Sequence, residues 1–459
     1  MKVAWCSVMG KLFGSSGVRG LVNTDLTPIL ACKVACAVAT HSDTKKVIIA
    51  KDTRVSGNML EDALVSGLIS SGNEIYLANI VPTPALAYTS KKMGADAGFM
   101  LTASHNPPPY NGLKVFKADL SYTDTDQEAV EKIVDKGCYK RADWRNIGKV
   151  FNVDAAKLYL DMAKKAVKLK NHWSVVVDSG CGAAFYVAPE MLKALGCKVL
   201  ALNSQPDGYF PARKSEPNAE SLQDLAKTVK IMGADIGVAF DGDADRVAFV
   251  DENGSFVNFD RSLAAYSAFM LERNSGGTIV TTIEASMCVD TMAERYGGTV
   301  LRTKVGDIYV SEAIRREGAI FGGEPCGAWV HPQHHFCPDG LLSAAFFIAA
   351  IQDQCTTVSE FIENIPKYPT QRISFNCKNE SKYRLIEKLG RVLKTMFPNF
   401  KDYSTIDGVR ITLKNGWFLV RASGTEPLIR LTVEGKTIQA AKDITRKATA
   451  IVQKEIEEI

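Results

Sequence analysis

The feature that most constrains the fold is a short apolar run that recurs along the chain and ends in polar or glycine-rich residues. Four such runs cover residues 47–50, 175–177, 236–240 and 278–281. Continuously apolar runs of this length are typical of strands that are buried on both faces of a sheet. Amphipathic helical stretches, such as residues 58–68 and 154–167, lie between them. The alternation predicts doubly wound or mixed α/β domains with functional sites at the strand ends.

The C-terminal part of the chain has a different pattern. Residues 408–413, 417–420 and 428–433 alternate in the way of antiparallel strands, and a charged helix is predicted over residues 437–458. These elements indicate a small α+β domain. A chain of 459 residues is too long for one hydrophobic core, so its length predicts two to four domains. Boundaries are expected near residues 150, 252 and 367, after the turn at Gly148, the strand ending at Val250 and the 366–369 linker.

Composition excludes several classes of protein. Hydrophobic residues make up 46% of the chain and charged residues 23%, as in an ordinary globular protein. The net charge of +4 is small, and basic and acidic residues are interspersed, so a nucleic-acid partner is not expected. The longest strongly apolar stretch, residues 341–351, is about half of what a membrane span needs. The first twenty residues lack a signal-peptide core, and the 11 cysteines form no C-x-x-C pair. We therefore expect a cytoplasmic protein with reduced thiols and no membrane partner.

A serine loop is the first candidate site. Residues 102–107 read Thr-Ala-Ser-His-Asn-Pro and follow the apolar run 98–101. The small residues and the prolines that follow predict a stiff loop that exposes the hydroxyl of Ser104. Lys114 follows a turn predicted at Asn111 and Gly112, and a lysine there can neutralise phosphate charge or move a proton. A surface turn with an incidental serine is the alternative.

An aspartate cluster is the second candidate site. Asp241, Asp243 and Asp245 alternate with small residues and are followed by Arg246. Alternate residues of an extended segment point the same way, so these carboxylates are expected to converge on one cation. Hard oxygen ligands favour Mg²⁺, and without a cation the three charges would repel one another. The alternative is a solvated acidic loop. A serine that carries a phosphoryl group beside such a metal is a phosphoryl donor, so the two sites indicate an enzyme that moves phosphate.

Three glycine-containing loops fit the handling of sugar phosphates. The loop 421–427, together with Arg430, offers hydroxyls, backbone N–H groups and guanidinium groups that can hold a phosphate. The loop 14–20, which contains Arg19, is similar but less diagnostic. The loop 322–327 carries Glu324, which is suited to accept hydrogen bonds from sugar hydroxyls, or which alternatively starts a helix. There is no G-x-x-x-x-G-K-[ST] sequence, so a P-loop nucleotide site is not indicated.

A group of histidines near a cysteine leaves one further alternative. His331, His334, His335 and Cys337 are close in sequence. They are the residue types that bind zinc, although a loop with incidental histidines is the simpler interpretation.

These motifs, in this order and spacing, resemble the α-D-phosphohexomutase family over essentially the whole chain. The resemblance implies a four-domain, heart-shaped α/β fold: three α/β domains with mixed sheets and a C-terminal α+β domain. It assigns the phosphoserine loop to residues 1–149, the metal loop to 150–251, the sugar loop to 252–366 and the phosphate-binding loop to 367–459.

The resemblance also implies roles for individual residues. Ser104 is then the phosphoserine, and its oxygen completes the Mg²⁺ site of the three aspartates. Arg19, Lys114 and Arg246 match positions for charge stabilisation and acid/base work. The remaining matches are Glu324 and Cys326 for the sugar hydroxyls, Lys304, Gly306 and Asp307 in a neighbouring loop, and Arg421, Ser423, Gly424, Thr425 and Arg430 for the non-reacting phosphate. Two positions depart from the family: Cys326 stands where serine or asparagine is common, and Ala328 where many members have histidine. Either His331 or His334 takes the place of that histidine, or no histidine takes part.

The implied reaction is the reversible interconversion of hexose or hexosamine 6-phosphate and 1-phosphate through a 1,6-bisphosphate, which also serves as activator. One Mg²⁺ per subunit and a monomer or homodimer are expected. The form of the sugar loop, with Trp329 and the sequence Pro-Asp-Gly at 338–340, most resembles phosphoglucosamine mutases of archaeal type, with phosphomannomutase/phosphoglucomutase as the alternative. Two other classes are a phosphatase of the haloacid-dehalogenase type, whose aspartate pattern differs where Arg246 stands, and a catalytically silent sugar-phosphate sensor.

Overall fold

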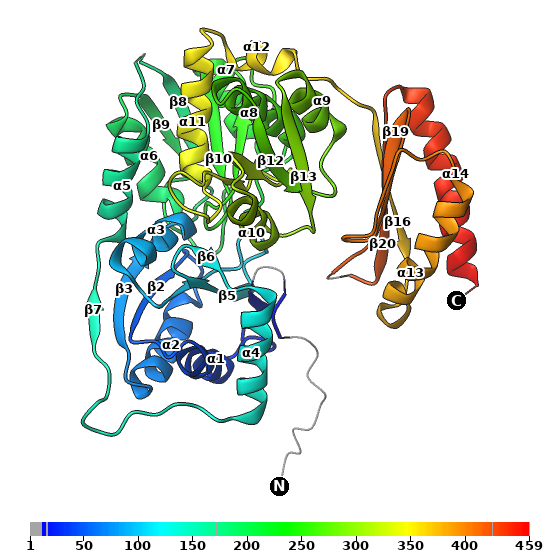
Figure 1. Cartoon of the computed structure of the whole chain (residues 1–459). Helices are drawn as coiled ribbons and strands as arrows, with labels where there is room; N and C mark the ends of the chain where they lie inside the picture. The colour runs from blue at the N-terminus through cyan, green and yellow to red at the C-terminus, as the bar shows by residue number, and fades with distance from the viewer. Residues whose placement is uncertain (1–11, 15–16, 171, 425, 459) are drawn as a thin grey trace. The chain divides into compact units, whose positions relative to one another are not determined.

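The computed structural model describes residues 12–14, 17–170, 172–424 and 426–458. The chain forms two compact units, each made from two segments. The first unit contains Met1–Val257 and Cys326–Phe361, and the second contains Asn258–Pro325 and Ile362–Ile459. Figure 1 shows the elements of both units.

The first sheet of the first unit carries most of its strands in parallel. Its strand order is β1-β5-β4-β2-β3-β7, with β6 paired to β5. The strands are β1 (Val18–Leu21), β2 (Lys46–Lys51), β3 (Glu74–Ile80), β4 (Ala97–Leu101), β5 (Tyr110–Lys117), β6 (Leu120–Ser121) and β7 (Val150–Asn152). Strands β2, β3, β4 and β7 run parallel, whereas β5 is antiparallel to both β1 and β4. Parallel strands end at the same edge, so the loops that follow β2 and β4 are neighbours.

Helices cover both faces of this sheet (Figure 1). They are α1 (Pro28–His41), α2 (Gly57–Ser70), α3 (Thr83–Met93) and α4 (Asp124–Lys136). The apolar side chains of α1 and α2 pack with Val47 and Ile49 of β2 in one buried core. Helix α4 starts with a capping box in which Thr123 and Asp126 satisfy each other's backbone N–H groups. The predicted helix at 58–68 lies within α2.

The second sheet of the first unit has the order β11-β10-β8-β9. The elements are α5 (Ala155–Ala166), β8 (Ser174–Asp178), α6 (Ala184–Ala194), β9 (Lys198–Leu202), α7 (Gln223–Met232), β10 (Ile236–Phe240) and β11 (Val247–Val250). Strands β8, β9 and β10 are parallel, and β11 returns antiparallel to β10. The loop 241–246 therefore connects two adjacent antiparallel strands. Strand β15 (Trp329–Val330) and helix α11 (Gly340–Asp353) also belong to this unit, where Phe347 of α11 stacks on Phe249 at a ring distance of 4.1 Å.

The second unit contains a parallel sheet and an antiparallel one. Its first part has α8 (Phe259–Arg273), β12 (Gly277–Thr282), α9 (Met287–Arg295), β13 (Gly298–Thr303), α10 (Asp307–Glu317) and β14 (Phe321–Gly323). Strand β12 pairs in parallel with both β13 and β14. A short helix, α12 (Val358–Glu363), spans the point where the chain enters this unit again. The strands expected over 236–240 and 278–281 are thus present as β10 and β12.

The C-terminal sheet is antiparallel, as its alternating pattern predicts. Its order is β16-β20-β19-β18-β17. The elements are β16 (Thr370–Asn376), α13 (Asn379–Met396), β17 (Asp402–Ser404), β18 (Val409–Leu413), β19 (Gly416–Ala422), β20 (Leu428–Gly435) and α14 (Ile438–Glu457). Both helices pack their apolar faces on one face of the sheet to form a single core. Across the described residues, the ten cysteines are free thiols and no helix has the length and apolar character needed to cross a membrane.

Candidate functional site

Ser104 lies in the loop that follows β4, and its side chain points at the aspartate cluster. Its Oγ donates a hydrogen bond to Asp241 Oδ2 at 2.6 Å. Its backbone N–H donates to Thr102 Oγ1 at 2.8 Å, and its φ is 50°, a left-handed conformation that a serine rarely adopts. The prediction of an exposed hydroxyl is wrong: Ser104 is only 1% exposed, because the loop folds back on the aspartates. Strained backbone of this kind clusters at functional sites.

Lys114 reaches the same cluster from strand β5. It lies opposite Met100 in the antiparallel pair of β4 and β5. Its Nζ is 2.7 Å from Asp243 Oδ2 and 2.5 Å from Asp245 Oδ2. The turn predicted at Asn111 and Gly112 is wrong, because both residues lie inside β5 and the chain reverses earlier, within residues 104–109.

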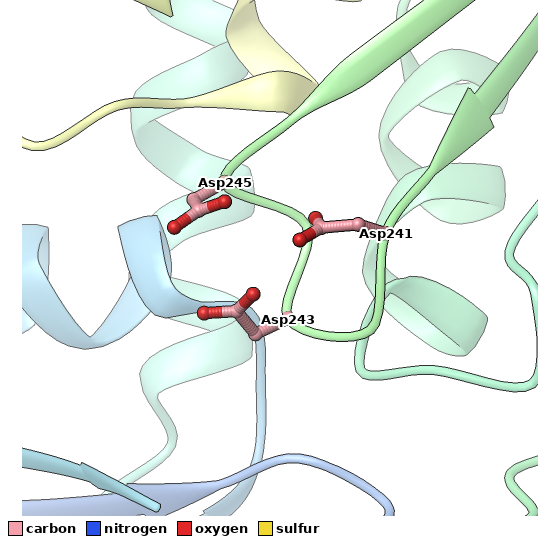
Figure 2. A group of neighbouring side chains, drawn as sticks. All are labelled: Asp241, Asp243 and Asp245. Atoms are coloured by element: carbon pink, nitrogen blue, oxygen red, sulfur yellow. The ribbon is translucent and has the colours of Figure 1, made fainter. Parts of the chain in front are cut away.

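The three aspartates come together as expected, but for a different reason. One carboxylate oxygen of each lies within 4.8 Å of the others, and all three residues are buried (Figure 2). Residues 242–245 form turns and a bend rather than an extended segment, and Ala244 has a φ of 58°. The side chains therefore converge because the loop curls around them. The solvated acidic loop is excluded by their burial.

Thr83 ties the aspartate loop to the first sheet, and sequence reasoning missed this residue. Its Oγ1 donates to Asp243 Oδ2, and its backbone N–H donates to the carbonyl of Asp243 at 2.9 Å. Thr83 is the first residue of α3, and a threonine at a helix start is so common that it gives no signal of this contact.

The electrostatics of the cluster fit a bound cation. Burial, together with repulsion from Asp245 and Asp243, raises the pKa of Asp241 well above its usual range. Burial and repulsion from Asp243 likewise raise the pKa of Asp245. Burial opposes ionisation of Asp243 too, but the Lys114 ammonium outweighs it and lowers the pKa of that carboxyl. Two buried oxygens, Asp243 Oδ1 and Asp245 Oδ1, have no hydrogen-bond partner. A divalent cation supplies the charge and the ligand contacts that these oxygens lack.

Two arginines and a histidine surround the serine. Arg19 of β1 donates from Nη1 to Asn106 Oδ1 at 3.1 Å. The Nε of Arg246 is 4.0 Å from Asp245 Oδ1, and its backbone N–H donates to Asp241 Oδ1 at 3.3 Å. The Arg246 charge, burial and the Arg19 charge lower the pKa of His105 to about 2, so this imidazole is neutral. Its Nδ1 is 3.3 Å from Ser104 Oγ. The sequence motif contained His105, but nothing in it assigned the residue a contact with the serine.

The predicted sugar loop lies in the second unit. Glu324 directly follows β14, so it does not start a helix. Its Oε1 accepts a hydrogen bond from the backbone N–H of Gly306 at 2.8 Å, and Gly306 has a φ of 136° that favours glycine. Asp307 begins α10, and Lys304 Nζ lies 5.3 Å from the centre of the Tyr309 ring. The structure thus joins Glu324 to the 304–307 loop. Cys326 is partly buried and belongs to the first unit.

The predicted phosphate loop also lies in the second unit, at the end of β19. Arg421 Nε forms an ion pair with Asp407 Oδ2 at 2.9 Å, and Asp407 Oδ2 also accepts from the backbone N–H of Val305 at 3.1 Å. Ser423 is buried, and its N–H donates to the Leu428 carbonyl at 2.9 Å. Gly424 is exposed, Arg430 pairs with Glu426, and Thr425 lies outside the described residues. Asp407 therefore links the two loops, a contact that no motif indicated.

The histidine and cysteine group does not form a metal site. Within the described part of the chain, the three aspartates are the one group of three or more such side chains placed to hold a metal ion. His331 Nε2 is 2.9 Å from Ser343 Oγ, and His335 Nε2 is 2.8 Å from Asp339 Oδ2. His334 stacks on Phe346 at a ring distance of 5.4 Å. Each of these histidines contacts neighbouring side chains of the same unit and none belongs to a metal-binding group, so the simpler interpretation holds.

Comparison with known proteins identifies the family. Sequence models of phosphoglucomutase/phosphomannomutase match α/β/α domain I at residues 10–141, domain II at 157–254, domain III at 258–368 and the C-terminal domain at 373–450. The chain belongs to the phosphoglucomutase/phosphomannomutase family, whose members are phosphohexomutases. The expected fold class and reaction class are thereby confirmed.

Individual relatives cover nearly the whole chain. A probable phosphoglucosamine mutase of Thermococcus kodakarensis is 43% identical over 98% of this chain and 100% of the relative. One from Methanothermobacter thermautotrophicus is 42% identical over 96% of this chain and 98% of the relative. A crystal structure of a phosphoglucomutase/phosphomannomutase family protein from Burkholderia thailandensis superposes with a TM-score of 0.87 at 27% identity, covering 96% of this chain and 98% of the other.

Proposed function

We propose that this protein is active as a phosphoglucosamine mutase, interconverting glucosamine 6-phosphate and glucosamine 1-phosphate. The observation that carries the proposal is the serine hydroxyl 2.6 Å from Asp241 Oδ2, inside a buried group of three carboxylates. A hydroxyl in this position supports a phosphoserine that exchanges its phosphoryl group beside a metal ion. The choice of sugar is supported by relatives 43% and 42% identical that are named probable phosphoglucosamine mutase.

The reaction has two mirrored transfers. In the first, the bond between phosphorus and Ser104 Oγ breaks, a bond to the sugar hydroxyl oxygen forms, and the hydroxyl proton passes to a base. The 1,6-bisphosphate then turns around, and its other phosphoryl group returns to Ser104 Oγ. Arg19, Lys114 and Arg246 surround the serine loop and the aspartates with positive charge. Since phosphoryl transfer passes through a loose, in-line transition state, this charge and the positioning of the serine supply most of the catalysis.

A metal ion has a defined place in this proposal. Asp241, Asp243 and Asp245 would hold one Mg²⁺ together with an oxygen of the phosphorylated Ser104. Bound there, Mg²⁺ would neutralise charge on the transferring phosphoryl group. The unpartnered oxygens of Asp243 and Asp245 support this assignment. Lys114, which now contacts Asp243 and Asp245, is a candidate for acid/base work when the carboxylates turn to the ion.

The other predicted loops would bind the rest of the substrate. Glu324, with Cys326, would contact the sugar hydroxyls, and Lys304, Gly306 and Asp307 would lie beside them. The hydrogen bond from the Gly306 N–H to the Glu324 carboxylate supports a shared role for these two loops. The non-reacting phosphate would be held by Arg421, Ser423, Gly424, Thr425 and Arg430. We retain the four-domain division of the sequence, in which each domain brings one loop.

A second candidate is phosphomannomutase/phosphoglucomutase activity. It is favoured by the description of the family and by the 27% identical protein of Burkholderia thailandensis. A solved N-acetylphosphoglucosamine mutase of Aspergillus fumigatus, described in complex with GlcNAc-6P and magnesium, is only 16% identical with a TM-score of 0.58, so its likeness concerns the fold alone.

A coupled mutase assay separates the candidates. It compares kcat/KM for glucosamine 6-phosphate, mannose 6-phosphate and glucose 6-phosphate with Mg²⁺, each with its own 1,6-bisphosphate. We expect a preference of tenfold or more for the glucosamine substrate, about 1.4 kcal/mol of transition-state discrimination. A preference for mannose or glucose phosphate supports the second candidate. Release of inorganic phosphate as the main product, or binding without turnover, contradicts both.

A further inference from the structure

Arg54 uses its entire hydrogen-bonding capacity on the backbone of the serine loop and on Asp52. A guanidinium group has five N–H donors in a fixed fork. Nε donates to Asp52 Oδ2 at 3.0 Å. The two terminal nitrogens make four bonds, all to carbonyls: Pro107 and Tyr110 at 2.8 Å each, Ser104 at 2.9 Å and Asn106 at 2.7 Å. All five donors are therefore engaged, and none is left to bind a phosphate group.

Asp52 extends this hold to the amide of Ser104. Thr102 Oγ1 donates to Asp52 Oδ2 at 2.7 Å and accepts from the N–H of Ser104 at 2.8 Å. Arg54 in turn donates directly to the Ser104 carbonyl. Both backbone polar groups of Ser104 are thus tied to one buried ion pair. With its backbone held in this way, Ser104 can still rotate about its Cα–Cβ bond.

The ion pair is sealed from solvent and packed in place. The side chains of Arg54 and Asp52 are both 0% exposed. The ring of Phe210 lies 5.1 Å from the guanidinium carbon of Arg54. Gly208 approaches so closely that a Cβ there would lie 2.8 Å from the Arg54 Cα. A loop of the second sheet therefore presses the arginine against the serine loop of the first sheet.

We infer that Arg54 is a positioning residue for phosphoryl transfer: by holding three carbonyls of the serine loop and that of Tyr110 at the start of β5, it keeps Ser104 in its left-handed conformation, with the hydroxyl on the aspartates. The inference rests on the proposed function, because it assigns Arg54 a role in the same reaction. Transfer between bound groups is sensitive to distance, and a misplacement of about 1 Å can cost on the order of 100-fold in rate. The effect of Arg54 is thus expected on the rate of transfer and not on the binding of sugar phosphate.

The test variants separate position from charge. Arg54→Lys keeps the positive charge beside Asp52 but supplies three donors from one atom, which cannot span the four carbonyls. Thr102→Val keeps the size and branching of the side chain and removes the link between Asp52 and the Ser104 amide. The matched control is Arg261→Lys, because Arg261 also donates to two backbone carbonyls, those of Ile362 and Ile365, in the second unit.

The measurement is a single-turnover experiment on the full chain. Enzyme labelled with ³²P at Ser104 is mixed with saturating glucosamine 6-phosphate and Mg²⁺, and label transfer is followed by rapid quench. The rate constant reports positioning, whereas a loss of folded protein lowers only the amplitude. We expect the rate constant to fall about 100-fold in Arg54→Lys and about tenfold in Thr102→Val, with Arg261→Lys within twofold of wild type. The dissociation constant of the sugar phosphate should change less than threefold in all three.

Two results would overturn the inference. The first is a wild-type rate constant in both Arg54→Lys and Thr102→Val with only a lower amplitude, which would mean that the pair merely stabilises the fold. The second is a weakening of sugar-phosphate binding that accounts for the whole loss. If Arg54→Lys does not accumulate as folded protein, Thr102→Val decides between these outcomes. A wild-type enzyme that transfers no label to any hexose phosphate contradicts the proposed function itself, a result distinct from wild-type transfer that the variants leave unchanged.

Discussion

The two candidate phosphate-handling regions of this protein place similar charges in opposite surroundings. In the first unit, Ser104, Lys114 and Asp243 are 1%, 3% and 0% exposed. In the second unit, the side chains of Arg421 and Arg430 are 24% and 52% exposed. Both regions contain ion pairs, but water screens only the second set.

The difference in exposure indicates which step of the proposed reaction each region serves. Charges in a water-excluded site interact strongly and are fixed before the substrate arrives, which suits the bond-breaking step. Ion pairs near solvent are weak, so the partners of Arg421 and Arg430 can be exchanged for a phosphate at little cost. In the proposed reaction the 1,6-bisphosphate turns around, so its non-reacting phosphate has to be released and bound again, which weak ion pairs allow. We therefore expect substitutions in the buried site to act mainly on kcat, and those in the exposed loop to act more on KM.

The largest effect is expected from Ser104→Ala. Removing the hydroxyl removes the acceptor and donor of the phosphoryl group, so turnover should fall at least about 10⁴-fold. The fold should persist, because alanine fits the space of serine and the backbone bonds to Arg54 and Thr102 remain. Steady-state assay and intact mass spectrometry check both points, since the variant should also lack the roughly 80 Da that phosphorylation adds to wild type. A retained phosphoryl group on another residue would contradict the assignment.

The next largest effect is expected from Asp243→Asn. The change removes one ligand charge and one of the carboxylates that pair with Lys114, so kcat should fall about 10³-fold and Mg²⁺ should bind at least about tenfold more weakly. Isothermal titration with Mg²⁺ and a kcat series at rising Mg²⁺ measure the two quantities. The control is Asp224→Asn, an exposed aspartate in the first turn of α7, which should match wild type. Unchanged Mg²⁺ affinity in Asp243→Asn would place the metal elsewhere.

A smaller effect is expected from Arg421→Gln. A charge-assisted hydrogen bond to phosphate is worth about 1.5–3 kcal/mol, so kcat/KM should fall roughly 10- to 100-fold, with most of the loss in KM. Arg446→Gln is the matched control, because Arg446 is 84% exposed on α14 and forms an ion pair with Asp443 on the same helix. A loss confined to kcat, or as large as that of Asp243→Asn, would break the contrast between the buried and the exposed region.

The strands and the chemistry at their ends were predictable because both leave local signals. The run 236–240 is apolar throughout and is β10, and the alternating C-terminal segments are β18, β19 and β20. Carboxylates directly after a buried strand predicted a site at the sheet edge, and the structure brings Asp241 together with Ser104 from another sheet. The sequence patterns therefore predicted which side chains form the site and that they meet at the edge of a sheet.

The local geometry was not predictable from the same signals. The aspartate loop was expected to be extended, whereas a left-handed Ala244 curls it. The reversal before Lys114 was assigned to Asn111 and Gly112, whose composition suits a turn, but their pairing with β1 keeps them in a strand. Arg54 donates to carbonyls that lie 50 to 56 residues further along the chain. A carbonyl is present in every residue and has no side-chain signature, so such contacts leave no pattern in the sequence.

The smallest effect is expected from the protonation of His331, a buried histidine outside the candidate site of the first unit. Burial and the neighbouring His334 and His335 lower the pKa of His331 from 6.5 to about 3, although Asp339 opposes the shift. The hydroxyl of Ser343 donates to the Asp339 carbonyl at 2.5 Å, so it accepts from His331 Nε2–H, which places the hydrogen of the neutral imidazole on Nε2. A lowered histidine pKa in the folded state means full stability above pH 6.5 and a loss as the pH falls towards 3. At pH 5 the unfolded chain binds a proton at this histidine and the folded chain does not, which lowers the free energy of unfolding by about 2 kcal/mol.

His331→Gln keeps a hydrogen-bond donor at this position and removes the titration, so it isolates the contribution of His331 from that of other groups. Hydrogen exchange of the α11 amides, compared between wild type and variant at pH 7 and at pH 5, measures local stability and cancels the intrinsic pH dependence of exchange. Wild type should lose about 2 kcal/mol more than the variant between the two pH values. Equal losses would mean that His331 takes up its proton without unfolding, and that burial in the first unit does not by itself exclude charge. In that case the strength of the serine and aspartate site would have to come from its ion pairs and hydrogen bonds, and the contrast with the exposed arginine loop would rest on geometry instead of solvent exclusion.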